Sequence, residues 1–300
     1  FRQPGADRVI VAHMALNPDT GGATLNGFDT IDKPCGGNGP WVSDIEVANT
    51  ADFYSLKRLY LACPATKKVV GYSWSGQIWN LQETIDTAAY GAPRSLASAD
   101  LDWNGKADLA IGLDAGGVLV YAAPISVDYQ PVLQFIALPT LQSVIDIALG
   151  DLNRDGFQDI ALIDNTPSAK RVLMFAGSVQ RNANEIVTRL FNPALAAITT
   201  PNIPSALALG DLDRDGWLDM VLAAPASDQV DVVRSTVFLY GLSVSDVITT
   251  GATVDGPNSV SLADLNHDGW TDIALSRRSL VGTQRIGAVL TTPRVDCDNT

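Results

Sequence analysis

The chain has few histidines and no long apolar run, and each shortage argues against a class of protein. Its 300 residues include only two histidines, His13 and His267, which leaves little room for a Ser-His-Asp triad or a histidine zinc site. No apolar stretch approaches the 18 residues of a membrane span, so we expect none. Lys and Arg number 20 against 33 Asp and Glu, and basic residues are not clustered, which argues against a nucleic-acid partner.

Motifs for common enzyme classes are also missing. The sequence contains no Gly-x-Ser-x-Gly, no P-loop and no dinucleotide-binding fingerprint. A hydrolase that uses two carboxylates stays open, because acids such as Asp29, Asp32, Glu83 and Asp86 lie outside the acidic motifs described next. We therefore expect a protein that is not an enzyme, with a polysaccharide lyase or hydrolase as the alternative.

Only three cysteines are present, and they agree with an exported protein. Cys35 and Cys63 flank an apolar hairpin, and we predict a disulfide between them. Cys297 is left over, either free or paired with another chain or a missing segment. It is the candidate for a covalent or assembly partner.

The sequence does contain four copies of one acidic nine-residue loop, at residues 100–108, 151–159, 211–219 and 264–272. Each copy has oxygen side chains at positions 1, 3, 5 and 9 and glycine at position 6. A hard cation such as Ca²⁺ needs six to eight oxygens at about 2.3–2.6 Å, and glycine supplies the positive φ that turns the chain beneath the ion. Position 7 need offer only its backbone carbonyl.

The pattern predicts about four bound Ca²⁺ ions. The expected ligands are Asp100, Asp102, Asn104, Lys106 and Asp108; Asp151, Asn153, Asp155, Phe157 and Asp159; Asp211, Asp213, Asp215, Trp217 and Asp219; and Asp264, Asn266, Asp268, Trp270 and Asp272. Asp, Asn and Gly also mark ordinary turns, but chance turns would not repeat one ligand pattern four times. An EF-hand is excluded, because it needs a glutamate at position 12, where all four copies are apolar.

The spacing of the loops sets the architecture. Their first aspartates lie 51, 60 and 53 residues apart, which indicates an array of supersecondary units. Short apolar runs flank each loop and suit buried strands, and a period of about 55 residues fits four strands. We predict an all-β chain, a β-propeller of about six four-stranded blades, with the calcium loops between the first two strands of four blades. Seven blades are the alternative, if the sequence is a fragment or one blade has diverged further.

The predicted organisation is a single domain over residues 1–300. Residues 1–92 hold degenerate blades, 93–292 the four calcium-loop blades, and 293–300 a tail or a ring closure. A decayed loop copy is expected at Asp44–Asp52, and Ala6–Ala12 resembles a strand that follows a loop. A closed ring would form if the segment near Gly287–Leu290 or Arg294–Asp296 completed the first blade.

The motif Gly-Asp-Leu-Asn-x-Asp-Gly-x-x-Asp-Ile-Ala, at residues 150–161, resembles the FG-GAP/VCBS repeats of integrin α-subunit propellers and of many secreted microbial proteins. The resemblance is strong over residues 93–280 and weak over 1–92. It implies that the loops bind calcium at the turn between the first two strands of a blade. It identifies no ligand pocket.

Composition and aromatic residues bear on the partner. The loops hold 13 aspartates, equal to the net charge of −13, so the acidity reflects metal sites more than a basic partner. Loops of this kind bind calcium weakly in extracellular modules, about 10⁻⁴–10⁻³ M, which favours an extracellular or cell-surface location, or the periplasm. Tyr72, Trp74 and Trp79 form an aromatic cluster that is either a structural strand or a contact patch.

The leading hypothesis is a secreted or cell-surface module that binds a glycan or a protein, in the manner of a lectin or an adhesion domain, with calcium as a structural clamp. One alternative is a structural part of a larger extracellular assembly. The other is the polysaccharide-active enzyme on a propeller frame.

Overall fold

The structure is a computed structural model, and it describes residues 8–16, 23–36, 42–49, 57–123, 131–138, 142–166, 170–183, 187–238, 242–249, 256–266, 268–277 and 285–289. In this part of the chain the strands are β1 (Arg8–Leu16), β2 (Ala23–Asp32), β3 (Ile45–Asn49), β4 (Lys57–Cys63), β5 (Lys68–Trp74), β6 (Trp79–Asp86), β7 (Pro93–Ala99), β8 (Asp108–Leu113), β9 (Gly117–Ala122), β10 (Val132–Ala137), β11 (Val144–Gly150), β12 (Asp159–Asp164), β13 (Arg171–Arg181), β14 (Val187–Thr199), β15 (Ala206–Gly210), β16 (Asp219–Ala224), β17 (Gln229–Phe238), β18 (Leu242–Thr249), β19 (Pro257–Ala263), β20 (Asp272–Arg277) and β21 (Arg285–Val289). Two short 3₁₀ turns are η1 (Pro64–Thr66) and η2 (Pro225–Ser227).

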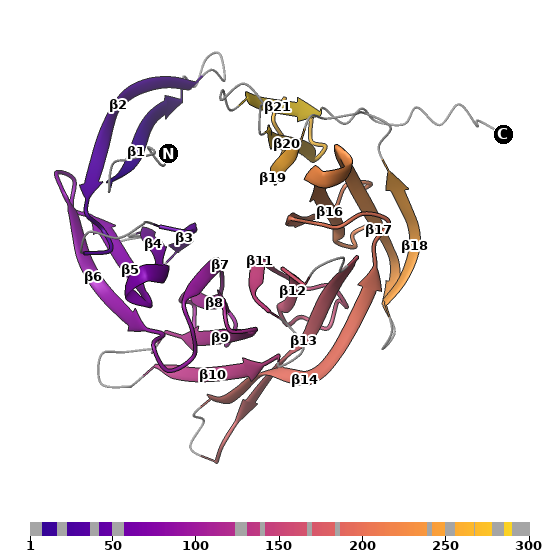
Figure 1. Ribbon diagram of the computed structural model, residues 1–300, viewed down its shortest axis with the longest axis horizontal. Coiled ribbons are helices and arrows are strands. Elements are labelled where there is room, and N and C mark those ends of the chain that lie inside the picture. The colour runs from indigo at the N-terminus through magenta and orange to yellow at the C-terminus, as the bar shows by residue number, and fades with distance from the viewer. Residues whose placement is uncertain are drawn as a thin grey trace.

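These strands form antiparallel sheets in chain order. Four sheets have four strands each, β3–β6, β7–β10, β11–β14 and β15–β18; β1–β2 has two strands and β19–β21 has three, all counted over the described residues. Figure 1 shows the sheets following one another around a common centre, with the first strand of each four-stranded sheet innermost and the fourth outermost. The predictions of an all-β chain and of four-stranded antiparallel sheets are confirmed.

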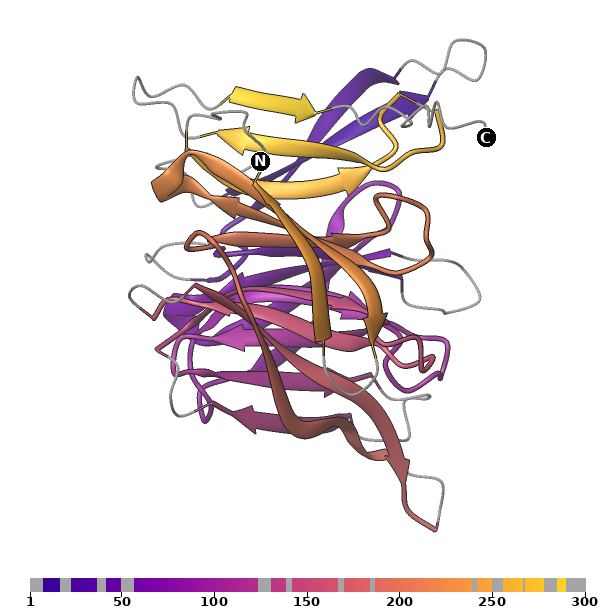
Figure 2. The same ribbon diagram turned by 90° about the vertical axis from the view of Figure 1, so that its right-hand side faces the viewer.

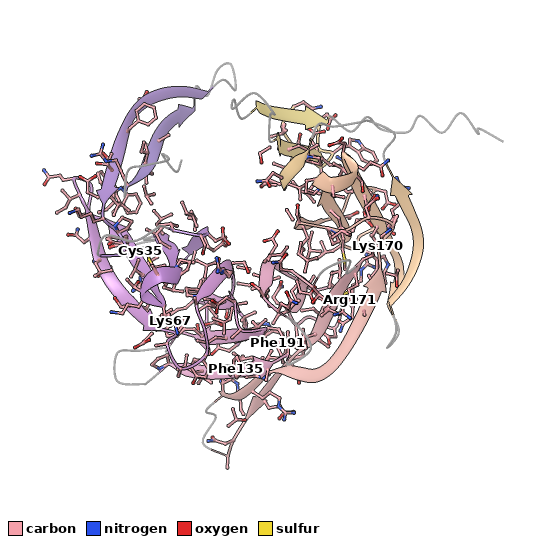
Figure 3. All side chains as sticks on the ribbon, viewed as in Figure 1. Cys35, Lys67, Phe135, Lys170, Arg171 and Phe191 are labelled. Atoms are coloured by element: carbon pink, nitrogen blue, oxygen red, sulfur yellow. A yellow bond between two sulfur atoms is a disulfide. The ribbon has the colours of Figure 1, made fainter. Side chains whose placement is uncertain are left out.

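Apolar clusters pack consecutive sheets against one another, and Figure 3 shows the side chains that lie between the sheets. Between β7–β10 and β11–β14, for example, Ala110 and Val120 pack with Ile160 and Phe175. The second strands β8, β12 and β16 are buried at every residue, because their alternating side chains face opposite neighbours. That double burial explains why the sequence beside each loop is apolar without interruption.

The β13–β14 hairpin is longer than the other hairpins of its sheet and extends beyond the neighbouring sheets (Figure 2). It is fixed to the preceding sheet by Gln134 of β10. The Gln134 Oε1 accepts the backbone N–H of Leu190 at 2.7 Å, and its Nε2 donates to the carbonyl of Phe191 at 3.2 Å. Phe191 is fully buried in the same cluster as Ile136.

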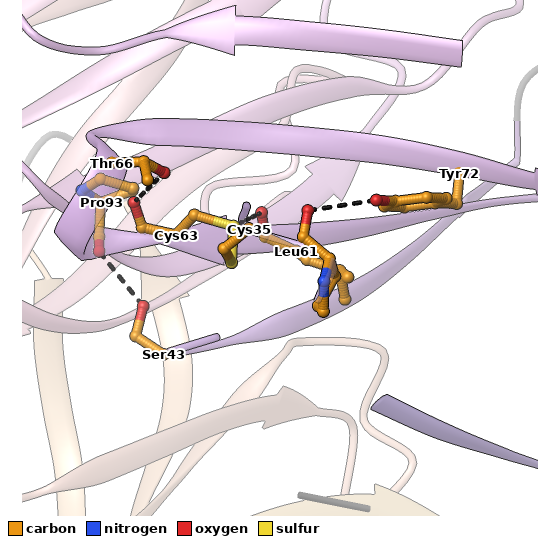
Figure 4. Close-up of a disulfide and its surroundings, with 8 residues drawn as sticks. Cys35, Ser43, Leu61, Cys63, Thr66, Tyr72 and Pro93 are labelled. Carbon is orange, nitrogen blue, oxygen red and sulfur yellow. Dashed lines mark hydrogen bonds between the residues drawn. A yellow bond between two sulfur atoms is a disulfide. The ribbon is translucent and has the colours of Figure 1, made fainter. Parts of the chain in front are cut away.

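The predicted disulfide is present. Cys35, which follows β2, is bonded to Cys63 at the end of β4, so the bridge joins the first sheet to the second (Figure 4). The sulfur atoms lie beside the cluster of Val9, Ile31 and Leu61 that packs these two sheets together. Among the described residues, no helix has the length and apolar character that crossing a membrane requires.

One prediction about the N-terminal third is wrong. Residues 45–49 are not part of a decayed loop; they form strand β3, in which Asn49 pairs with Lys57. In intact hairpins the residue before the loop makes this pairing, as Ala99 does with Asp108. The connection between β3 and β4 therefore starts six residues after Asp44, and it lies outside the described residues. The spacing of two between Asp44, Glu46 and Ala48 is the period of a strand as well as of loop ligands.

For closure of the ring, one of the two segments named in the prediction is contradicted. Strand β21, which contains Gly287, pairs with β20 in the last sheet and does not complete the first. Within the described residues no strand pairing joins β1–β2 to β19–β21. Arg294–Asp296 lies outside the described residues.

Candidate metal centre

The four acidic loops lie where the sequence predicts them, each between the first and second strand of a sheet. They connect β7 to β8, β11 to β12, β15 to β16 and β19 to β20. In each hairpin the last residue of the first strand pairs with the aspartate at loop position 9, as Gly150 pairs with Asp159 and Gly210 with Asp219. The strand pairing therefore brings the two ends of every loop together.

The aspartate at position 9 is the buried base of the loop. Its four copies, Asp108, Asp159, Asp219 and Asp272, are at most 3% exposed. The Asp108 carboxylate accepts the N–H of Leu101 and the N–H of Ala123, both at 2.8 Å. Burial, together with the charges of Asp102 and Asp100, raises the pKa of Asp108 to about 7. Burial also raises the pKa of Asp159 to about 6. A bound cation would favour the charged form of both.

The aspartate at position 1 accepts a hydrogen bond from the turn glycine. One carboxylate oxygen of Asp100, Asp151, Asp211 and Asp264 accepts the N–H of the position 6 glycine at 2.8–3.0 Å. Those glycines have φ between 82° and 89°, the left-handed region that favours glycine. The predicted turn beneath the ion is therefore present in all four loops.

The other oxygen of position 1 provides the test of whether a cation fits. Asp151 Oδ1 and Asp211 Oδ1 are buried and, among the described residues, have no hydrogen-bond partner. An unpaired buried carboxylate oxygen is costly unless a ligand satisfies it, and Ca²⁺ takes oxygen ligands of this kind. The residues present therefore fit a bound calcium ion.

Carboxylates converge most closely in two of the loops. The oxygens of Asp100, Asp102 and Asp108 lie within 4.8 Å of one another, and so do those of a second triad, Asp211, Asp213 and Asp215. Either triad could hold a metal ion. Both loops have aspartate at position 3, where the other two have Asn153 and Asn266. The loop at 211–219 is the only copy with four carboxylates at positions 1, 3, 5 and 9.

The sequence did not reveal the role of position 4. Trp103, Arg154 and Arg214 all have left-handed backbones, with φ between 57° and 62°. This conformation is uncommon outside glycine, and it turns the chain between ligand positions 3 and 5. The sequence carries no local signal for it, because Trp and Arg are not residues that favour this region. The fourth copy, His267, lies outside the described residues.

Two arginines also approach the loops from the third strands. Arg181 of β13 donates to the backbone carbonyl of Asp102 at 2.6 Å. Arg234 of β17 lies 3.8 Å from the Asp213 carboxylate. The sequence carries no motif that marks either contact.

The aromatic cluster at the outer hairpin is partly structural. Trp74 and Trp79 face each other across the β5–β6 turn, with ring centroids 5.4 Å apart. Tyr72 donates its hydroxyl to the Pro34 carbonyl at 3.1 Å (Figure 4), and Tyr72 and Trp79 pack against the cluster that joins the first two sheets. A contact patch here stays a prediction. Cys297 lies outside the described residues.

Of the acids outside the loops, Glu83 lies in a buried polar cluster. Its carboxylate accepts the hydroxyls of Tyr60 and Tyr121 and pairs with Arg58 at 3.1 Å. Tyr60 and Tyr121 are 1% and 7% exposed, and burial raises the pKa of both hydroxyls. Tyr121 comes from β9, so the cluster joins the β3–β6 and β7–β10 sheets.

Four of the sheets share one arrangement, in which an acidic loop joins the first two strands. The model of the FG-GAP-like repeat matches residues 211–275, from the first ligand of the third loop to the strand after the fourth loop. The chain therefore contains an FG-GAP-like repeat, as the resemblance indicated. No curated protein matches the chain.

Proposed function

We propose that this chain is a calcium-stabilised β-propeller outside the cell that binds a glycan or a protein partner, and that it is not an enzyme. The observation that carries the calcium part is the buried oxygen of Asp151 and Asp211, which has no partner among the described residues. Four loops of the same geometry and the FG-GAP-like repeat support it.

The arrangement of the sheets around a common centre supports a role in recognition. Sheets that pack face to face around a centre leave their connecting loops free to vary, and loops on a rigid scaffold often carry binding sites. The disulfide between Cys35 and Cys63 agrees with an oxidising compartment.

Calcium removal tests the structural part of this proposal. A ligand that binds only the folded state stabilises it by mass action, so four sites should raise the melting temperature in calcium above that in EDTA. We expect a difference of several degrees, measured by calorimetry. Equal melting temperatures would rule out calcium as a structural clamp.

A glycan array probed with the calcium-loaded protein tests the partner. A defined glycan that binds in calcium and not in EDTA is the expected result, and replacing Trp74 and Trp79 together asks whether the aromatic cluster contributes. The variant Arg94→Ala is the control, because it changes an exposed side chain outside the metal loops and outside the aromatic cluster. Absence of any glycan, with the calcium effect present, would favour a protein partner in a larger assembly.

A further inference from the structure

Successive loops touch through one repeated pair of positions. The side chain at position 4 of one loop contacts the ring at position 7 of the next loop along the chain. This contact occurs in every neighbouring pair of the four loops. The pairs are Trp103 with Phe157, stacked at 4.7 Å and 2° between the planes; Arg154 over Trp217 at 4.0 Å; and Arg214 over Trp270 at 4.3 Å.

Arg154 makes the fullest of these contacts. Beside its cation–π contact with Trp217, it donates from Nη2 to the Asp215 carbonyl and from Nε to the Gly216 carbonyl, both at 2.9 Å. It therefore holds the backbone of positions 5 and 6 in the next loop. A Cβ at Gly216 would clash with this guanidinium, and one at Gly269 would clash with Arg214. Glycine at position 6 thus leaves room for the arginine of the preceding loop and also permits the turn of its own loop.

The contact joins the ligand segments of both loops. Position 4 lies between ligand positions 3 and 5, and its left-handed backbone sets the direction of its side chain. Position 7 donates its N–H to the carboxylate at position 5, at 2.8 Å in Phe157, Trp217 and Trp270. Its own carbonyl is the expected ligand. An ion bound to one loop would order its positions 3 to 5 and so fix the side chain at position 4. That side chain in turn holds positions 5 to 7 of the next loop.

We propose that the loops bind their cations cooperatively, with Arg154 coupling the sites at 151–159 and 211–219 and Arg214 coupling the sites at 211–219 and 264–272. This inference rests on the proposed calcium binding. Coupling between sites is reciprocal, so each site should raise the affinity of its neighbour by the same factor. Couplings of this kind are typically about five-fold or more.

A double-mutant cycle on the whole chain tests the coupling. Asp155→Ala removes a ligand from the second loop, and a calcium titration followed by the NMR signals of the Gly156 and Gly216 amides reports the second and third loops separately. We expect Asp155→Ala to weaken calcium at Gly216 by about five-fold or more in the native background. In the Arg154→Ala background it should change the Gly216 midpoint by less than about two-fold.

Two further variants keep the result interpretable. Arg94→Ala removes an exposed arginine whose ion pair with Asp114 spans 4.0 Å, and coupling should survive it. Arg154→Lys keeps the charge and loses the forked donors, so it should fold if Arg154→Ala does not and should retain only part of the coupling.

The outcomes separate this inference from the proposed function. An unchanged Gly216 midpoint in Asp155→Ala overturns the coupling while calcium binding stands. An equal loss in both backgrounds removes Arg154 from the path and also overturns it. Tighter binding at Gly216 would show repulsion between the ions. If neither glycine signal responds at millimolar calcium, the proposed calcium binding fails as well.

Discussion

At the scale of residues, loop position 3 separates the four candidate sites by charge. Asp102 and Asp213 are carboxylates, whereas Asn153 and Asn266 are amides that donate to the position 5 aspartate at 3.0 Å. The number of charged ligands is one of the features that tune calcium affinity in loops of this kind. The loop at 211–219, with four carboxylates, is therefore expected to bind calcium most tightly.

Exchanging one amide tests this ranking. Asn153→Asp adds a carboxylate to the second loop and replaces a hydrogen bond to Asp155 by a repulsion that only a cation relieves. We expect calcium to bind the second loop several-fold more tightly, with a lower melting temperature in EDTA. Calorimetric titration and calorimetric melting measure the two effects. Asn153→Ser is the control, and equal affinity in both variants would contradict the ranking.

Two half-buried carboxyls on or next to the innermost strands predict a dependence on pH. Asp44 accepts the N–H of Leu96 at 2.7 Å, and Asp146 accepts the N–H of Leu207 at 2.8 Å, so each links its own sheet to the first strand of the next. Burial raises the pKa of Asp44 from 3.8 to about 6 and that of Asp146 to about 7, and the Asp44 charge adds to the second shift.

Because these folded-state pKa values are raised, ionisation costs folding free energy. The stability linked to the two carboxyls is fully present below about pH 4 and is lost as the pH rises through 6 and 7. In EDTA we expect the melting temperature to fall between about pH 5 and about pH 8. Asp146→Asn should flatten this slope, and Asp86→Asn, an exposed change on β6, should not. A slope unchanged by Asp146→Asn would contradict the assignment.

At the scale of elements, the hairpins that hold intact loops could be predicted from the sequence and the degenerate one could not. The repeats around Asp151 and Asp211 supply ligands, a turn glycine and apolar flanks together, and all three agree on the hairpin. Around Asp44 the acids at positions 1, 3 and 9 alone suggested a loop, although positions 1 and 3 also have the spacing of one face of a strand. The missing glycine at position 6 was the stronger signal.

Contacts between hairpins of neighbouring sheets also could not be predicted from the sequence. The distances from Arg154 to the next loop, or from Gln134 to Phe191, depend on how neighbouring sheets stack. The residue types at positions 4 and 7 are visible in the sequence, but no local rule pairs them across more than 50 positions. The disulfide was predictable because its cysteines flank one hairpin.

That disulfide joins the first two sheets, and its removal should destabilise this end of the molecule. Cys35 and Cys63 are separated by 28 residues, and a loop of that length is expected to contribute about 3.6 kcal/mol through the entropy of the unfolded chain. We expect the paired change of both cysteines to serine to lower the free energy of unfolding by about this amount in urea. Cys297→Ser is the control, and an equal loss there would contradict the assignment.

At the scale of the whole molecule, the leucine at loop position 2 reports whether a following sheet covers each loop. Leu101, Leu152 and Leu212 are between 2% and 9% exposed, because each packs into the next sheet. Leu265 of the last loop is 45% exposed. In β20, likewise, alternate residues are only half-buried, whereas β8, β12 and β16 are buried throughout.

The contrast gives a matched pair of variants. Leu152→Ala should cost about 2–5 kcal/mol of unfolding free energy, because it empties a packed site between two sheets. Leu265→Ala, the same change at the same loop position, should cost less than about 1 kcal/mol, because that side chain is already half in water. Urea denaturation of both variants in calcium measures the difference. Equal losses would show that another sheet or another chain covers Leu265 in solution, as contact between the last and first sheets of a closed ring requires.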